Sequence, residues 1–335
     1  MMPLRLVRPP DLEAAGRVLA EHGRRAVVRA GGIDLLDRWK EGIDRPDVVV
    51  DLRALLAGPD GPGLASLTAD EGHLAAGSLV TLEALAEAEL PPAFAAVRQA
   101  ASSAANPAIR RMATLGGNLL QRPRCWYFRH GDLVCLKKGG ARCLAAEGRN
   151  RYNAVLGGGP SYIVHPSTLA TALALYDGDV MHAGAEDPAG RIPLADLFVT
   201  PDRRLDAEHA LRPAQILTAV RLSAPPGLRS GYDAVRERRL YDWPYVEAAA
   251  ALRVEGGVLR DVRIVLGQVA PVPWRARAAE RRLEGAKATE AAFAEASRLA
   301  FEGARPLSDN AGKIAVGRGL VRRLLHRLAE IPLPA

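Results

Sequence analysis

The stretch that decides the fold reads Arg29-Ala-Gly-Gly-Ile-Asp-Leu35. It lies between residues 25–30, whose apolar pattern predicts a buried strand, and a short helix predicted over 35–40. Paired glycines allow positive φ angles and a close approach to a ligand, and the helix that follows presents free N–H groups to an anion. A phosphate or pyrophosphate is the expected ligand. Strand–Gly-Gly–helix turns also occur for purely structural reasons. The turn is neither a GxGxxG motif nor a P-loop, because the third glycine and the Gly-Lys-Ser/Thr ending are absent.

The rest of the N-terminal unit, residues 1–57, predicts a small α/β lobe. Asp11 is expected to be the N-cap of a helix whose apolar residues recur at helical spacing, and Gly23 is expected to end that helix. Residues 47–52 predict a second buried strand. The Pro- and Gly-rich residues 58–63 then predict a linker to the next unit.

A second glycine turn, Thr114-Leu-Gly-Gly-Asn118, lies in the following unit, residues 58–224. Gly116 and Gly117 again free the backbone, while the Thr114 hydroxyl and the Asn118 amide can orient a polar ligand. Two such turns on two α/β units suggest an extended ligand with two polar ends, held in the cleft between the units. A dinucleotide meets that requirement better than a single phosphate.

The remaining residues, 225–335, predict a third unit that combines a small sheet with helices. Alternating and apolar patterns predict antiparallel strands joined at Glu255-Gly-Gly257, and two helices close the chain. The last helix has leucines on one face and arginines elsewhere, which is typical of a helix packed on a sheet. The expected strands are 232–238, 247–254 and 262–268, and the expected helices are 290–301 and 316–329.

The composition is that of an ordinary globular protein. The 335 residues are 48% hydrophobic and 25% charged, which excludes disordered, collagen-like and coiled-coil chains. Three cysteines exclude a disulfide framework. The net charge of +7 is spread along the chain and aromatic residues make up 5%, which argues against nucleic-acid binding. No apolar run reaches the roughly 18 residues of a membrane span, and residues 1–10 lack the apolar core of an export signal, so the cytoplasm is the expected compartment.

Segments along nearly the whole chain resemble the flavoprotein (medium) subunit of the molybdenum hydroxylases, the family of xanthine dehydrogenase, carbon monoxide dehydrogenase and aldehyde oxidoreductases. Each segment alone is a weak match, but their shared order leaves little room for chance. The segments are Ala30-Gly-Gly-Ile-Asp-Leu-Leu36, Gly77-Ser-Leu-Val-Thr-Leu82, Asn106-Pro-Ala-Ile-Arg-Arg-Met-Ala-Thr-Leu-Gly-Gly-Asn118, His165-Pro-Ser-Thr-Leu-Ala170, Pro193-Leu-Ala-Asp-Leu-Phe198, Arg239-Leu-Tyr-Asp242, Leu266-Gly-Gln-Val-Ala-Pro-Val-Pro-Trp-Arg-Ala276 and Pro306-Leu-Ser-Asp-Asn-Ala-Gly-Lys313.

The resemblance implies an α+β fold: a two-lobed FAD-binding domain of the vanillyl-alcohol-oxidase (PCMH) type over 1–57 and 58–224, then a C-terminal domain over 225–335. We expect non-covalent FAD, because no attachment Cys or His is evident near the first turn. Family members usually carry Thr in place of Ile33 and often Asp in place of Thr168, so this chain offers fewer polar contacts there. The residues assigned to the cofactor are Arg29, Ala30, Gly31, Gly32, Ile33, Asp34, Leu35, Ser78, Thr114, Gly116, Gly117, Asn118, Ser167, Thr168, Tyr241 and Asp242.

Residues 119–165 lack helical or strand periodicity, and so long an irregular segment in a compact domain usually has a function. The segment holds all three cysteines, Cys125, Cys135 and Cys143, among many Arg and Lys side chains that would favour thiolates. It resembles the insertion that carries a [4Fe–4S] cluster in a branch of the aldehyde oxidoreductase medium subunits, which implies that the three thiols lie together as cluster ligands. The fourth cysteine of that branch is absent. A non-Cys fourth ligand, a three-iron cluster, zinc, a lost cluster and three unrelated thiols remain alternatives.

The implied function is electron transfer within a three-subunit enzyme. A large subunit with the molybdenum cofactor would oxidise an aldehyde or N-heterocycle, and [2Fe–2S] centres of a small subunit would deliver electrons to FAD in this chain. FAD would pass them to an external acceptor. No catalytic residue is predicted in this chain. A self-contained FAD-dependent oxidoreductase and a regulatory or binding module without FAD are the two alternatives.

Overall fold

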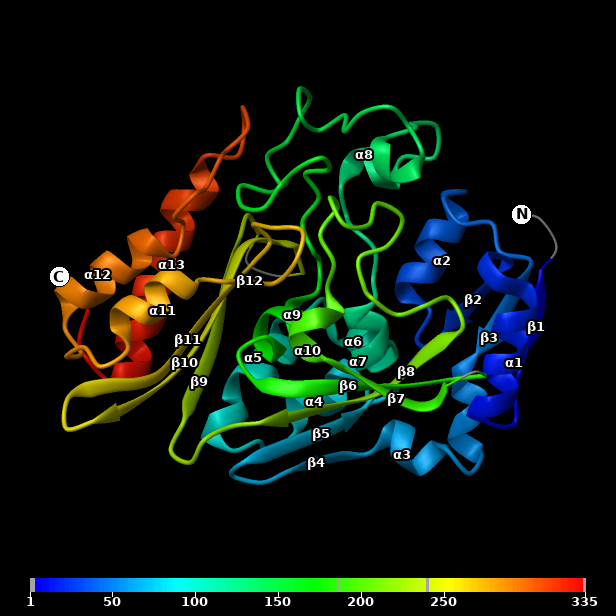
Figure 1. The fold of residues 1–335 in the computed structure, drawn as a ribbon, viewed down its shortest axis with the longest axis horizontal. Helices are drawn as coiled ribbons and strands as arrows, with labels where there is room; N and C mark the ends of the chain where they lie inside the picture. Colours follow the sequence, from blue (N-terminus) through cyan, green and yellow to red (C-terminus); the bar gives the residue numbers. More distant parts are fainter. Residues whose placement is uncertain (1–3, 186, 239–240, 334–335) are drawn as a thin grey trace.

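The computed structural model describes residues 4–185, 187–238 and 241–333 (Figure 1). The N-terminal lobe is a parallel sheet with the strand order β1-β3-β2. As predicted, Asp11 caps the first helix by accepting from the backbone N–H of Ala14 at 2.7 Å, and Gly23 ends it with a φ of 54°. The elements of the lobe are β1 (Arg5–Val7), α1 (Leu12–His22), β2 (Ala26–Arg29), α2 (Ile33–Lys40) and β3 (Val48–Asp51).

The middle lobe is built on a five-stranded antiparallel sheet with the order β4-β5-β8-β6-β7. The β6–β7 hairpin has no counterpart among the predicted elements, and the predicted linker 58–63 already contains the start of α3. The strands are β4 (Leu67–Ala69), β5 (His73–Gly77), β6 (Asp177–Gly184), β7 (Asp187–Pro193) and β8 (Gln215–Ser223). The helices are α3 (Gly61–Ala65), α4 (Leu82–Glu87), α5 (Ala95–Ser103), α6 (Pro107–Met112), α7 (Leu115–Leu119), α9 (Thr168–Leu173) and α10 (Leu194–Leu197).

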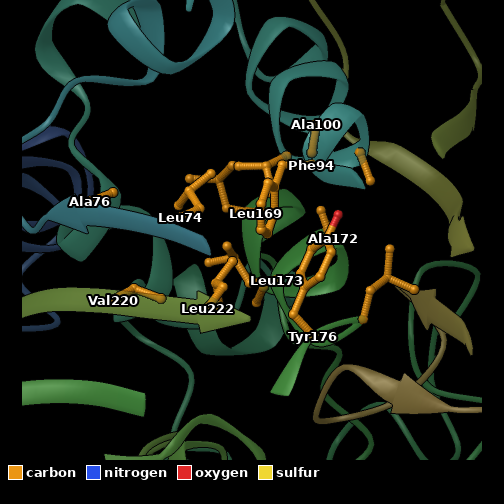
Figure 2. Packing of buried hydrophobic residues seen from close by; sticks show 14 of the residues in the cluster. Leu74, Ala76, Phe94, Ala100, Leu169, Ala172, Leu173, Tyr176, Val220 and Leu222 are labelled. Atoms are coloured by element: carbon orange, nitrogen blue, oxygen red, sulfur yellow. The ribbon is translucent and has the colours of Figure 1, made fainter. Parts of the chain in front are cut away.

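Helix α9 lies at the centre of the largest hydrophobic core, and every one of its residues is buried. Figure 2 shows Leu169 and Leu173 of this helix beside Leu74 and Leu222 of the sheet. Beyond its C-terminal end, the Tyr176 ring packs in the same core and its hydroxyl donates to a backbone carbonyl at 2.7 Å. The helix is therefore a rigid support for whatever its N-terminal end contacts.

The C-terminal unit is an antiparallel sheet with the order β12-β11-β10-β9, covered on one side by three helices (Figure 1). The predicted glycine turn joins β10 to β11, with Gly256 and Gly257 both at positive φ. The elements are β9 (Arg229–Arg236), β10 (Pro244–Glu255), β11 (Val258–Gly267), β12 (Trp274–Arg275), α11 (Arg277–Leu283), α12 (Glu290–Leu299) and α13 (Gly312–Ala329). Within the described parts of the chain, no helix has the length and apolar character to cross a membrane.

The segment 119–165 is largely irregular, as predicted, with one short helix, α8 (Trp126–Arg129), and one 3₁₀ turn, η4 (Leu136–Lys138). In Figure 1 it runs along the top of the view, between α2 on one side and the C-terminal helices on the other. Its far end is attached to the C-terminal unit by side-chain amides. The Asn150 amide donates to the Ser308 hydroxyl at 2.9 Å, and the Asn310 amide donates to the Asn153 carbonyl at 3.2 Å.

Lys313 strengthens this attachment from a fully buried position on α13. Its side-chain nitrogen donates to the carbonyls of Tyr152, at 2.8 Å, and Gln268, at 2.5 Å. Burial lowers the pKa of the amine from 10.5 to about 7. The protonation of Lys313 is therefore coupled to folding.

We expect Lys313 to make the free energy of unfolding increase with pH between about 7 and 10.5. Over that range the unfolded chain binds a proton that the folded chain does not, so raising the pH removes a cost of folding. In Lys313→Met this contribution should vanish. The difference in the free energy of unfolding between wild type and variant, measured by urea denaturation, should therefore change with pH between about 7 and 10.5. A pH-independent difference would show that the buried amine stays charged.

Candidate cofactor-binding site

A cavity of about 560 Å³ lies where the N-terminal lobe, the middle lobe and the C-terminal unit meet. Small-molecule sites commonly measure ~300–1,000 Å³, so the cavity suits a dinucleotide-sized cofactor. Its walls come from the β2–α2 turn, from α6 and α7, from β8 and from residues 241–243, which precede β10. Both glycine turns lie on it.

The first turn owes its shape to two glycines with different roles. Gly32 is in the left-handed region, with a φ of 81°, and is the residue from which α2 starts. A Cβ on Gly31 would lie 1.8 Å from the carbonyl oxygen of Met112. Gly32 therefore sets the turn, while Gly31 lets the N-terminal lobe approach the end of α6. The free N–H groups at the start of α2 border the cavity.

The second turn is the first turn of α7 rather than a loop. The Thr114 hydroxyl caps this short helix by accepting from the N–H of Gly117 at 3.2 Å. Gly116 packs against Ser78: a Cβ added to Gly116 would lie 3.0 Å from the Cβ of Ser78. Gly117 is exposed toward the cavity, and an added Cβ there would meet only the Thr114 hydroxyl among described atoms within 4 Å. The space in front of Gly117 is thus open for a ligand.

Asn118 connects this turn to α9. Its side-chain oxygen accepts from the Ser167 hydroxyl at 2.7 Å. Ser167 itself caps α9 by accepting from the N–H of Ala170 at 2.9 Å, and it does not line the cavity. Thr168, the next residue, does line it. Ser167 therefore has an orienting role in the structure, which differs from the direct contact expected from the sequence.

Asp34 lines the cavity, but its carboxylate is already occupied by arginines. It pairs with Arg129 at 2.6 Å and with Arg124 at 3.1 Å, both from the 119–165 segment, and with Arg38 at 3.0 Å. Burial alone would raise the pKa of the Asp34 carboxyl, but the charges of these three arginines hold it below its ordinary value. The side chain is therefore an ionic anchor for the inserted segment, a role that the sequence did not reveal.

Several cavity residues escaped the sequence reasoning because they come from distant segments. Arg124 stacks over the Trp243 ring at 4.7 Å, and Arg236 donates to the carbonyl of Asp242 at 3.1 Å. These contacts hold the segment that contains Tyr241, which has a φ of 60° and an exposed ring. The other cavity residues missed include Arg38, Gln121, Arg204, His209 and Arg212.

Unsatisfied polar atoms show that the cavity is suited to a polar ligand. The Ser78 hydroxyl, Nε of Arg124 and Nδ1 of His209 are buried and find no hydrogen-bond partner among the described residues. All three residues line the cavity. Buried polar groups are normally paired, so a bound group with several acceptors would complete the site. An FAD molecule, with its phosphates and ring heteroatoms, fits these donors and the open glycine surface.

Of the residues that the sequence assigned to the cofactor, all but Ser167 lie along this one cavity. Ile33 presents an apolar side chain to it, with 37% of its surface exposed. The residues brought together are Arg29, Ala30, Gly31, Gly32, Ile33, Asp34, Leu35, Ser78, Thr114, Gly116, Gly117, Asn118, Thr168, Tyr241 and Asp242.

The three cysteines do not form the expected ligand set. Among the residues that the structure describes, no three His, Cys, Asp or Glu side chains are grouped so as to hold a metal ion. Cys125 and Cys143 approach the same stretch, accepting from the Asn153 amide at 3.6 Å and from the N–H of Tyr162 at 3.5 Å. Cys135 is instead buried at the start of η4.

The electrostatics of the segment also differ from expectation. Several of its cations are paired with carboxylates, as in Lys137–Glu208 at 2.8 Å and Arg142–Glu147 at 3.0 Å, while Nζ of Lys138 donates to the carbonyl of His130 at 2.6 Å. Burial raises the pKa of the Cys125 thiol. Among the described residues the three thiols are thus not arranged as one three-ligand metal group, and no electron-transfer step is assigned to this segment.

Comparisons with known proteins identify the family of the chain. Residues 2–225 match the family described as FAD binding domain in molybdopterin dehydrogenase, and residues 231–330 match the CO dehydrogenase flavoprotein C-terminal domain. The aldehyde oxidoreductase FAD-binding subunit PaoB of Escherichia coli is 35% identical over 306 residues, or 90% of each chain. The carbon monoxide dehydrogenase medium chain of Afipia carboxidovorans is 26% identical over 325 residues, 96% of this chain and 94% of its own.

Solved structures show the same fold. Quinoline 2-oxidoreductase from Pseudomonas putida matches with a TM-score of 0.74 at 21% identity, covering 98% of both chains. CO dehydrogenase from Oligotropha carboxidovorans matches with a TM-score of 0.75 at 23% identity, covering 99% of this chain and all of the other. The α+β fold expected from the sequence is thereby confirmed. The two domain families together match most of the chain, which therefore belongs to the FAD-binding medium subunits of the molybdenum hydroxylases.

Proposed function

We propose that this chain binds FAD non-covalently in the cavity and transfers electrons as the medium subunit of a molybdenum-dependent hydroxylase. The observation that carries the proposal is the convergence of both glycine turns on one cavity that contains unpaired polar atoms. When bound, FAD would supply the redox chemistry, because flavins exchange electrons singly or in pairs. The protein would supply binding, orientation and electrostatics.

The roles of the cavity residues follow from their positions. Backbone N–H groups at the start of α2, around Gly32, and at the start of α7, around Gly117, would hold the pyrophosphate and ribityl groups. The Ser78 hydroxyl would supply one further hydrogen bond. Tyr241 and Asp242, at the opposite wall, would face the flavin ring, as the family resemblance implies. Arg236 would act indirectly, by holding Asp242 in place.

The partners proposed are a large subunit with the molybdenum cofactor and a small subunit with [2Fe–2S] centres. The named relatives are a subunit of an aldehyde oxidoreductase and medium chains of carbon monoxide dehydrogenases. An aldehyde or N-heterocycle is the proposed substrate class of the complex, and the electrons would leave FAD for an external acceptor. No group in this chain is proposed to activate that substrate.

The domain boundaries proposed are 1–57 and 58–224 for the two FAD-binding lobes, with the insertion at 119–165, and 225–335 for the C-terminal domain. The change from one sheet to the next near these positions supports them. The cytoplasm is the proposed compartment. The three free cysteines are in keeping with a reducing environment, and fractionation of cells for this chain would test it.

Acid precipitation should release a yellow supernatant with the mass of FAD. The reason is that the site holds the cofactor through backbone and hydroxyl groups, which denaturation disperses. Mass spectrometry of the supernatant and of the pellet makes the measurement. A colourless protein, or flavin that remains on the precipitated chain, would contradict non-covalent binding.

The purified chain loaded with FAD should not oxidise aldehydes or N-heterocycles, whereas the reconstituted complex should. The described residues offer no three-ligand metal group, and the proposed function assigns substrate oxidation to the molybdenum subunit. Substrate-dependent reduction of an artificial acceptor, followed with and without the partner subunits, tests this. Turnover by the chain alone would support the self-contained oxidoreductase instead.

A further inference from the structure

The carboxyl group of Glu247 is buried directly behind the cofactor cavity. Glu247 is on β10 and has no exposed surface. Among the described residues it makes no ion pair, and its side chain is contacted by the hydroxyl groups of two threonines and of Tyr232. One carboxyl oxygen is 2.9 Å from Oγ1 of Thr168, and the other is 3.0 Å from Oγ1 of Thr171. A buried carboxylate without a cation is costly, so its protonation state requires explanation.

The surrounding backbone makes room for this carboxyl group. Glu247 is paired with Gly267 on β11, and a Cβ at Gly267 would lie 2.3 Å both from the Glu247 carboxyl and from the Thr171 hydroxyl. Any larger residue at that position would displace the pair. The pocket for the carboxyl is therefore formed jointly by a strand glycine and by the two threonine side chains of α9.

The hydrogen bonds among Glu247, Thr168 and Thr171 can be assigned consistently if Glu247 is an uncharged acid. The Thr168 hydroxyl donates to one oxygen of Glu247, and the protonated oxygen of Glu247 can donate to the Thr171 hydroxyl. Thr171 in turn donates to the carbonyl of Ser167 at 3.4 Å. The hydroxyl hydrogens of both threonines and the acid proton of Glu247 then each have an acceptor. An ionised carboxylate would take both hydroxyl protons and would bury its charge without a counterion.

The neighbouring titratable and charged groups do not provide such a counterion. Strand β9 brings Tyr232 and Arg236 toward Glu247, while α9 and β11 bring the threonines and the glycine. Burial raises the pKa of the Glu247 carboxyl, and the hydroxyl groups and the charge of Arg236 offset that rise only in part. By contrast, the buried Glu208 pairs with Arg122 at 2.9 Å and with Lys137, which hold its pKa below the ordinary value despite burial.

We propose that Glu247 is an uncharged, proton-bearing acid that positions Thr168 on the cavity wall and keeps that wall electrically neutral. The functional part of this inference rests on the proposed function, since it is directed at bound FAD. Reduction of a flavin bound in the cavity would add negative charge there. A carboxylate buried nearby would disfavour that reduction, because charges repel strongly where the dielectric constant is low. Glu247 is thus a positioning residue, and Thr168 is the group that contacts the cavity.

Infrared spectroscopy of the full chain tests the proton directly, with or without FAD. The wild type should show the carbonyl stretch of a buried protonated carboxylic acid, and Glu247→Gln should lose it. Thr168→Val should shift the band to higher frequency, because the hydroxyl that donates to the carbonyl oxygen is removed. Glu208→Gln is the matched control and should leave the band in place. Absence of the band in the folded wild type would overturn the proposal.

The flavin midpoint potential of the loaded chain tests the functional consequence. Glu247→Gln preserves shape and neutrality, so the potential should equal that of the wild type, whereas a rise in potential would reveal an ionised Glu247 and overturn the inference. If the chain does not bind FAD, the proposed function fails, while the infrared result still decides the state of Glu247.

Stability gives an independent readout. If the pKa of a carboxyl is raised in the folded state, the free energy of unfolding falls as the pH rises above the ordinary pKa of 4.5. Glu247→Gln should therefore unfold at a higher urea concentration than the wild type at neutral pH, with a gap that widens from about pH 4.5 upward. A variant less stable than the wild type throughout would contradict a neutral acid.

Discussion

Gly117→Val should abolish FAD binding, and Gly32→Val should do the same for a different reason. At Gly117 the backbone is ordinary but the space in front of it is open, so the two methyl groups of valine would occupy the place of the ligand. At Gly32 the φ of 81° disfavours any β-branched residue. Such backbone strain costs ~1–3 kcal/mol, and the steric block adds to it. We expect a loss of affinity of at least ~100-fold, or about 2.7 kcal/mol.

Fluorescence titration of the apoprotein with FAD measures this loss, and Gly256→Val is the matched control. Gly256 also has a positive φ, 56°, but it lies in the β10–β11 turn with open space around it and does not line the cavity. It should lower stability without changing FAD affinity. FAD binding by Gly117→Val with wild-type affinity would mean that the second turn does not face the cofactor.

Glu208→Ala should cost the folded state about 3–5 kcal/mol, the range for removing one partner of a buried ion pair. Glu208 accepts from Arg122 at 2.9 Å and from Lys137 at 2.8 Å, and only 1% of the Lys137 side chain is exposed. Without the carboxylate, two cations remain in a poorly solvated environment. The inserted segment, which carries both cations, should become more susceptible to proteolysis.

Urea denaturation of Glu208→Ala and of Glu147→Ala gives the comparison. Glu147 pairs with Arg142 on the surface, with 80% and 71% of the two side chains exposed, so its loss should cost about 0–1 kcal/mol. Because the pKa of Glu208 is held below 4.5, its stabilisation should be present above that pH and be lost as the pH falls through the folded pKa. Equal effects of the two substitutions would show that the buried network is not stabilising.

The parts of the site that the sequence predicted are those in which a local pattern sets local geometry. A strand, two glycines and a helix start dictate the turn at Gly32 whatever the rest of the chain does. Thr114 likewise sits one residue before α7, where a hydroxyl caps the helix. Such features depend on positions a few residues apart, and a single sequence displays them.

The parts that the sequence did not predict depend on contacts between distant segments. Asp34 and Arg129 are 95 positions apart, so nothing in the first turn shows that its carboxylate is already occupied. The same cause affects the cysteine segment, because Lys137, which is close to Cys135 in the sequence, is paired in space with the remote carboxylate of Glu208. Glu247 is the single charged residue in the apolar run Tyr245–Leu252, but its threonine partners could not be identified without the fold.

The spread of the cavity walls along the chain has a consequence for biosynthesis. The first wall contains Gly32 and the last contains Trp243. At translation rates of about 5–20 residues per second, the first turn leaves the ribosome roughly 10–40 s before the opposite wall exists. During that interval the nascent N-terminal lobe has no enclosed place for the cofactor. We therefore expect loading with FAD to follow synthesis of this last wall, and ribosome-bound chains truncated before residue 243 to carry no flavin.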